Sequence, residues 1–104
     1  MDQLNLIIKA VNDSVAVEKI ILFGSYATKK ANNNSDLDIA VIEKDTPKLG
    51  QKAKIWQRLS KLGFNWEIDP DIHLFSKQDF NTRLSQNDLF IQEILKGEEI
   101  QNGN

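Results

Sequence analysis

The chain has 104 residues, with 13 basic and 15 acidic side chains, a formal net charge of −2, and no cysteine. The slight acidic excess argues against a dedicated nucleic-acid-binding protein, and the absence of cysteine excludes a disulfide framework and thiolate metal sites. We find no signal peptide and no apolar run long enough to span a membrane, so we expect a cytoplasmic protein without a membrane partner.

The first predicted elements are a helix and a short buried strand. Apolar residues recur at helical spacing over residues 3–14, which predicts an amphipathic helix. Residues 20–23 are four consecutive apolar residues, a run typical of a buried strand. Gly24 then allows a sharp turn and close approach to a ligand, and Ser25 is a good helix N-cap. Residues 26–31 are predicted to form a short helix, whose first N–H groups would bind an anion such as phosphate.

A pair of aspartates opens the next predicted strand, over residues 36–42. Because side chains alternate across a strand, Asp36 and Asp38 emerge on the same face, roughly 6–7 Å apart along the backbone. Two carboxylates this close repel each other unless a proton or a cation lies between them. Oxygen ligands beside a phosphate site favour Mg²⁺. The stretch therefore predicts a phosphate site next to a metal site.

This glycine-serine turn followed by the aspartate pair resembles the signature of the polymerase-beta-like nucleotidyltransferases, and the short chain resembles their minimal branch. Members carry GSxARG, a short spacer and SDxD, and the segment GSYATKKANNNSDLD matches this pattern without a gap. Thr28 and Lys29 stand where the family has Arg-Gly. We expect Lys29 and Lys30 to replace the missing arginine, although a lysine contacts phosphate only as a point charge.

A basic helix is predicted next. Thr46 and Pro47 predict its N-cap and first position, it would run to Leu62, and Gly63 followed by Phe64 predicts its end. Its inner side would consist of Leu49, Ala53, Trp56, Leu59 and Leu62. The basic outer face is typical of a solvated surface, with docking of an acidic partner or an RNA as the alternative.

The third strand is predicted over residues 71–75. Pro70 cannot donate a ladder hydrogen bond, so the strand should start after it or lie at a sheet edge there. The resemblance implies a third carboxylate at this strand's start, and we favour Asp71. Asp69 shares its strand parity and is the alternative, although a residue before proline is more typical of a turn. His73 shares the face of Asp71, and we interpret it as a packed or half-exposed residue.

Two further helices complete the prediction. Ser76 begins a capping-box-like pattern for a helix through about Leu84, and a second amphipathic run covers residues 89–96 and ends at Gly97. We expect one domain over residues 1–100 and a disordered polar tail over residues 101–104. The fold class is α+β, with a small mixed sheet of three or four strands and helices packed mainly on one face.

The resemblance implies a Mg²⁺-dependent nucleotidyltransferase that transfers a nucleoside monophosphate, AMP from ATP in the first instance, with two Mg²⁺ ions. The residues that it implies for phosphate binding are Gly24, Ser25, Lys29 and Lys30. Those that it implies for metal binding and catalysis are Asp36, Asp38 and Asp71.

The resemblance also implies the partner. Short members of the family are encoded beside helical HEPN proteins and act as antitoxins, so the implied acceptor is a HEPN toxin. One alternative is a catalytically degraded antitoxin that acts by binding alone. The other is a small-molecule transferase of the antibiotic-modifying type, which the absence of an acceptor-binding domain disfavours. The sequence does not distinguish a monomer from a homodimer.

Overall fold

A four-stranded sheet in the order β3-β2-β1-β4 forms the centre of the molecule, as a computed structural model of residues 3–24 and 37–102 describes it. The strands are β1 (Val17–Phe23), β2 (Leu37–Glu43), β3 (Pro70–Ser76) and β4 (Glu98–Asn102). β1 pairs antiparallel with both β2 and β4, whereas β2 pairs parallel with β3. The predicted α+β class with a mixed sheet of up to four strands is confirmed.

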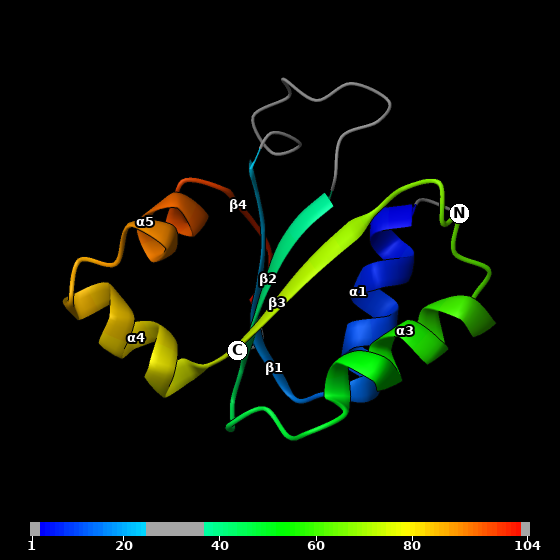
Figure 1. The fold of residues 1–104 in the computed structure, drawn as a ribbon, viewed down its shortest axis with the longest axis horizontal. Coiled ribbons are helices and arrows are strands. Elements are labelled where there is room, and N and C mark those ends of the chain that lie inside the picture. The colour runs from blue at the N-terminus through cyan, green and yellow to red at the C-terminus, as the bar shows by residue number, and fades with distance from the viewer. Residues whose placement is uncertain (1–2, 25–36, 103–104) are drawn as a thin grey trace.

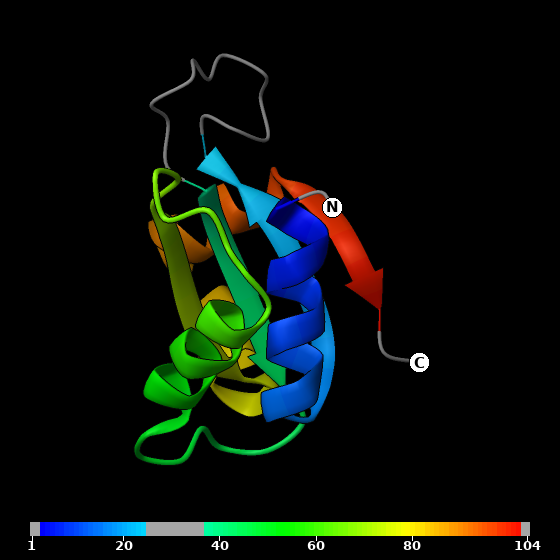
Figure 2. The same cartoon turned by 90° about the vertical axis from the view of Figure 1, so that its right-hand side faces the viewer.

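Helices cover both faces of this sheet (Figures 1 and 2). The described helices are α1 (Gln3–Ser14), α3 (Gln51–Lys61), α4 (Lys77–Ser85) and α5 (Leu89–Leu95). α1 and α3 lie on one face, and α4 and α5 lie on the other (Figure 1). The predicted placement of helices mainly on one face is therefore wrong, because the central strands are apolar on both sides and each side needs a cover.

Each face has its own hydrophobic core. On the α1/α3 face, Ile20 of β1 and Ile39 of β2 pack in a cluster that also contains Ile55 of α3. Their chain neighbours Ile21 and Ala40 point to the opposite face, as strand geometry requires, and pack with α4 and α5. A continuous apolar strand thus holds two separate layers of helices together.

The start of α3 differs from the prediction at Thr46 and Pro47. The helix begins at Gln51, and Gly50 before it has a φ of 86°, a left-handed conformation that cannot belong to a continuing helix. Leu49, predicted on the inner side, is fully exposed. The predicted end is confirmed, since the helix stops at Lys61 and Phe64 behind it is buried.

The C-terminal strand was absent from the prediction. Gln101 and Asn102, assigned by their polarity to a disordered tail, belong to β4 and pair with Ile20 and Lys19 of β1. Asn12 of α1 also exchanges side-chain hydrogen bonds with Gln101, at 2.7 and 2.9 Å. Pairing with an apolar neighbour therefore forms a strand from a sequence without a strand pattern.

The remaining elements agree with the sequence. α1 has the predicted bounds, and Ser76 caps α4 by accepting a hydrogen bond from the Asp79 backbone N–H at 2.9 Å. Pro70 is the first residue of β3 and is the register partner of Leu37. Because β3 is an edge strand of the sheet, this is one of the two positions that we predicted for a residue without a backbone N–H. No helix among residues 3–24 and 37–102 is long and apolar enough to cross a membrane.

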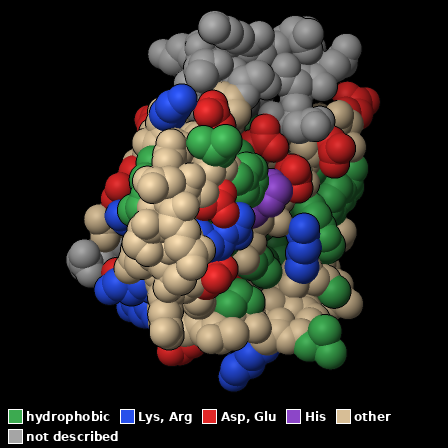
Figure 3. Space-filling model, turned by 60° about the vertical axis from the view of Figure 1, so that its left-hand side comes forward, with side chains coloured by type: hydrophobic (Ala, Val, Ile, Leu, Met, Phe, Trp, Pro, Cys, Tyr) green, Lys and Arg blue, Asp and Glu red, His purple; other side chains and the backbone are tan. Residues whose placement is uncertain are grey.

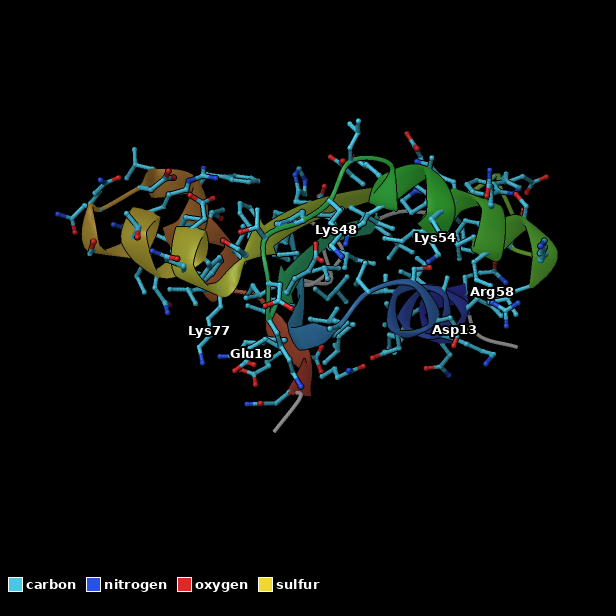
Figure 4. The ribbon with its side chains drawn as sticks, turned by 90° about the horizontal axis from the view of Figure 1, so that it is seen from below. Asp13, Glu18, Lys48, Lys54, Arg58 and Lys77 are labelled. Atoms are coloured by element: carbon cyan, nitrogen blue, oxygen red, sulfur yellow. The ribbon has the colours of Figure 1, made fainter. Side chains whose placement is uncertain are left out.

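Two ion pairs link elements at the end of the sheet that Figure 4 views. Arg58 of α3 donates to Asp13 of α1 at 2.8 Å, and Lys77 of α4 lies 3.4 Å from Glu18 of β1. Both pairs are partly exposed, so each contributes at most a small stabilisation.

Candidate metal and nucleotide site

Three side chains with ligand atoms meet where β2 and β3 begin and β1 ends. In the parallel ladder Asp38 is the register partner of Asp71, and in the antiparallel ladder it is the partner of Phe23. His73 follows two residues after Asp71 and therefore shares its face. The sheet register thus brings together residues 33 positions apart in the chain.

The cluster of Asp38, Asp71 and His73 is compact. One ligand atom from each residue lies within 4.8 Å of the other two. The His73 Nε2 atom is 3.2 Å from the Asp71 Oδ2 atom, a hydrogen-bonding distance. The Asp71 side chain is 52% exposed and that of His73 is 28% exposed, so the cluster is open to a ligand from solvent.

Aromatic side chains surround the His73 ring. Its centroid lies 5.6 Å from the Phe23 ring and 5.2 Å from the Phe90 ring, and those two phenyl rings lie 5.7 Å apart. Phe90 comes from α5, so this helix supplies one wall of the site. The imidazole, the only histidine in the chain, reaches the surface beside acidic side chains (Figure 3).

The orientation of α5 is set by its N-cap. Asp88 accepts hydrogen bonds from the backbone N–H groups of Phe90 and Ile91, at 2.9 and 3.2 Å. Arg83 donates to the same carboxylate at 2.9 Å, and this hydrogen bond is the main reason that the pKa of Asp88 lies below its usual value. The cap fixes the backbone at Phe90 and so the aromatic wall next to His73.

Gly24 lies directly beside the Asp38 carboxylate. Its φ is 77°, and a Cβ atom at this position would overlap the Asp38 Oδ2 atom. Glycine is therefore required both by the turn and by the close approach of the carboxylate. The sharp turn predicted at Gly24 agrees with this geometry, whereas its predicted contact with a phosphate stays a prediction.

The predicted site residues divide into two groups. Gly24, Asp38 and Asp71 lie together at this end of the sheet. The other predicted residues, Ser25, Lys29, Lys30 and Asp36, lie outside the described residues. Among the residues that are described, the cluster includes Asp71 but not Asp69, which is exposed ahead of β3 and accepts a hydrogen bond through its backbone from Leu37.

Two residues of the site were not assigned to it from sequence. His73 was interpreted as a packed or half-exposed residue, which agrees with its 28% exposure, but it was not assigned to the site although its parity with Asp71 placed both on one face. Phe90 carried no signal, because its contact with β1 and β3 depends on how α5 packs on the sheet.

The family comparison agrees with this geometry over almost the whole chain. A family model described as polymerase beta nucleotidyltransferase matches residues 5–103. The chain belongs to the polymerase beta nucleotidyltransferase family. The resemblance inferred from the glycine-serine turn and the aspartate pair is confirmed.

Two curated relatives are protein adenylyltransferases by name. The chain is 38% identical over 89 residues to the protein adenylyltransferase MntA of Shewanella oneidensis, covering 83% of this chain and 60% of the relative. It is 35% identical over 52 residues to a putative protein adenylyltransferase of Methanocaldococcus jannaschii, covering 50% of this chain and 52% of the relative. The matched part of the chain thus spans only between about half and three fifths of the length of these relatives.

Solved structures with the same fold come from toxin–antitoxin complexes. One chain of a toxin–antitoxin complex with AMP-PNP matches with a TM-score of 0.69 and 25% identity, covering 98% of this chain and 74% of that one. A chain from a complex of tri-AMPylated Shewanella oneidensis HEPN toxin with MNT antitoxin matches with a TM-score of 0.55 and 29% identity, covering 98% of this chain and 73% of that one.

Proposed function

We propose that this protein is a Mg²⁺-dependent nucleotidyltransferase that transfers AMP from ATP to a protein acceptor, a HEPN toxin for which it serves as the antitoxin. The observation that carries the proposal is the pairing of Asp38 with Asp71 across two parallel strands, next to a glycine turn, in a chain of the nucleotidyltransferase family. The names of the relatives support a protein acceptor and an adenylyl group.

The donor set fits a divalent cation. Asp38 and Asp71 offer carboxylate oxygens, which Mg²⁺ prefers, and the 52% exposure of Asp71 leaves room for a nucleotide phosphate beside them. We assign metal binding to Asp38 and Asp71 and, from the sequence pattern, to Asp36, with two Mg²⁺ ions in all. Bound Mg²⁺ would neutralise phosphate charge and stabilise the charge that develops during transfer.

Each residue then has a task in one balanced step. The acceptor hydroxyl oxygen bonds to the α-phosphorus of ATP, the bond to the bridging oxygen breaks, and pyrophosphate leaves. Asp71, exposed at the strand start, accepts the proton of the hydroxyl. Gly24 makes room for the Asp38 carboxylate, and Gly24, Ser25, Lys29 and Lys30 are expected to hold the phosphates, as the sequence pattern indicates.

The partner rests on the relatives rather than on a surface of this chain. Structures that resemble it were solved as toxin–antitoxin complexes, one of them with an AMPylated HEPN toxin. A contact-only antitoxin is the second candidate, because Thr28 and Lys29 replace the Arg-Gly of the family pattern. Both candidates bind the same partner, so the discriminating observation is whether the partner becomes labelled.

The test compares Asp71→Asn with Asp69→Asn, which makes the same charge change two residues away and outside the cluster. Wild type, incubated with α-labelled ATP, Mg²⁺ and the product of the adjacent reading frame, should label that protein. Asp71→Asn should still co-purify with the partner but label it about 10²–10⁴-fold more slowly, the usual cost of losing a general base. Asp69→Asn should label at the wild-type rate.

Two results would contradict the proposal in different ways. Full labelling by Asp71→Asn together with none by Asp69→Asn would move the third carboxylate by two residues and leave the reaction in place. If wild type never labels the toxin, and Asp71→Asn protects against the toxin as well as wild type does, the protein is a contact-only antitoxin.

A further inference from the structure

We propose that the His73 Nε2 atom is a metal ligand, and that this nitrogen makes the site prefer Mn²⁺ over Mg²⁺. The inference rests on the proposed metal site and deepens it by adding a nitrogen ligand to the proposed aspartates and by naming the ion that this nitrogen favours. The sequence pattern of the family, a set of aspartates, gave no reason to assign this task to a histidine two residues after Asp71.

The distances are those of ligands around one ion. Neighbouring ligands of a six-coordinate ion lie about 3 Å apart when each is about 2.1 Å from the metal. His73 Nε2 and Asp71 Oδ2 are separated by 3.2 Å. The full set with Asp38 lies within 4.8 Å, close to the roughly 4 Å that separates opposite ligands. Small side-chain rotations therefore suffice to place all three around one ion.

The imidazole is held in this orientation by packing. Phe23 and Phe90 lie against the ring at 5.6 and 5.2 Å, from β1 and from α5, and neither offers a polar atom. The side chain is 28% exposed, and its Nε2 atom faces the cluster, 3.2 Å from the Asp71 Oδ2 atom. A ligand whose rotamer is already fixed loses little conformational entropy when it binds the ion.

The donor chemistry selects the ion. Carboxylate and water suit Mg²⁺ and Mn²⁺ alike, whereas imidazole suits transition metals and binds Mg²⁺ poorly. Two carboxylates with one imidazole, and open positions for phosphate oxygens, match an octahedral ion rather than a closed tetrahedral Zn²⁺ site. Among the first-row transition metals, Mn²⁺ is the ion that shares with Mg²⁺ the preference for octahedral sites rich in carboxylate and water oxygens, so we compare these two ions.

The competing interpretation is that His73 only positions the Asp71 carboxylate, through the 3.2 Å contact of its Nε2 atom with Asp71 Oδ2. In that case substitution of His73 would lower the affinities for Mn²⁺ and Mg²⁺ equally, because the carboxylate that binds both ions would be displaced. Ligation predicts instead a selective loss of Mn²⁺. The ratio of the two affinities therefore separates the interpretations.

The experiment uses the full chain with non-hydrolysable ATP at one fixed pH, and compares wild type with His73→Phe and His73→Gln. His73→Phe keeps an aromatic ring between Phe23 and Phe90 but has no nitrogen. His73→Gln keeps a donor for Asp71 and offers an oxygen in place of the imidazole nitrogen. Mn²⁺ affinity is read from the loss of the free-ion electron paramagnetic resonance signal, and Mg²⁺ affinity from competition. Unfolding curves without metal verify that the variants fold.

Wild type should show ¹⁴N modulation in the pulsed spectrum of bound Mn²⁺, and both variants should lose it. The preference for Mn²⁺ over Mg²⁺ should fall about 10–100-fold in His73→Phe, the range known for disturbed metal ligation, and also in His73→Gln. Wild-type Mn²⁺ without nitrogen modulation, or an unchanged ratio in both variants, would overturn the proposal. These readouts need no transfer, so an inactive protein that passes them would refute only the proposed activity.

Discussion

At the residue scale, the close approach of the Asp38 carboxylate to Gly24 predicts that a larger residue at position 24 abolishes metal binding. In Gly24→Ala the new methyl group would overlap the Asp38 carboxylate, and the φ of 77° would cost roughly 1–2 kcal/mol in a non-glycine residue. We expect loss of metal binding in addition to lower stability. Metal titration and chemical unfolding of the variant measure the two effects separately.

Gly50→Ala is the matched control for this substitution. Gly50 has a φ of 86°, so it bears the same backbone penalty, but no atom lies within 4 Å of its added Cβ. The Gly50→Ala variant should lose only the roughly 1–2 kcal/mol that a positive φ costs a non-glycine residue, and it should bind metal with wild-type affinity. Equal metal binding by Gly24→Ala and Gly50→Ala would show that the Asp38 carboxylate does not need this space.

Glu43 gives a second residue-scale prediction, on pH. Its side chain is 2% exposed at the end of β2, and burial raises its pKa above the usual value of 4.5 despite a hydrogen bond with Gln51. Above pH 4.5 the unfolded chain loses this proton before the folded one does, so the free energy of unfolding falls as pH rises through that window. Glu43→Gln should therefore gain stability relative to wild type as pH rises above about 4.5, measured by denaturant unfolding. A constant difference would contradict the raised pKa.

At the element scale, α5 depends on its cap. Asp88→Ala removes the acceptor of two backbone N–H groups and the partner of Arg83. We expect a lower melting temperature and faster amide exchange at Phe90, with Asp88→Ser recovering most of the cap because serine is also a good N-cap. The pKa of Asp88 is lower in the folded protein than in the unfolded chain. The stability that its charged carboxylate contributes should therefore be lost as pH falls through the folded-state pKa. The same loss of stability at low pH in wild type, Asp88→Ala and Asp88→Ser would contradict this.

The elements also show what local sequence determines. Helix ends marked by Ser76 and Gly63 were predictable, because caps and stops act through neighbouring backbone groups. The strand after Asp36 was predictable because its apolar run is local, although Asp36 itself lies outside the described residues. The Thr46-Pro47 start was wrong because a proline permits a helix start without requiring one.

Long-range packing accounts for the remaining differences. β4 forms because β1 offers an unpaired edge, and nothing in its polar sequence indicates this. The contact of His73 in β3 with Phe90 in α5 joins residues 17 positions apart in the chain, and only the packing of α5 on the sheet brings the two together. His73, which shares a strand with Asp71, was therefore within reach of sequence reasoning, and Phe90, which lies on α5, was not.

At the scale of the whole molecule, one sheet joins two cores, and the site belongs to only one of them. Ile55 of α3 and Ile91 of α5 are both fully buried, in the clusters on opposite faces. Each is an isoleucine in a helix that packs on the sheet, so Ile55→Ala and Ile91→Ala form a matched pair. Either substitution should cost about 2–5 kcal/mol in the free energy of unfolding.

The two variants should differ at the site. Unfolding should remain a single cooperative transition in both, because the sheet is shared and the domain is small. Ile91→Ala loosens α5 next to Phe90, so it should weaken Mn²⁺ binding, whereas Ile55→Ala leaves the α4/α5 face intact and should bind Mn²⁺ like wild type under folding conditions. Metal titration of both variants at equal folded fraction makes the comparison. Equal loss of Mn²⁺ affinity in both would mean that the site responds to overall stability, and that the α5 wall has no separate part in holding His73.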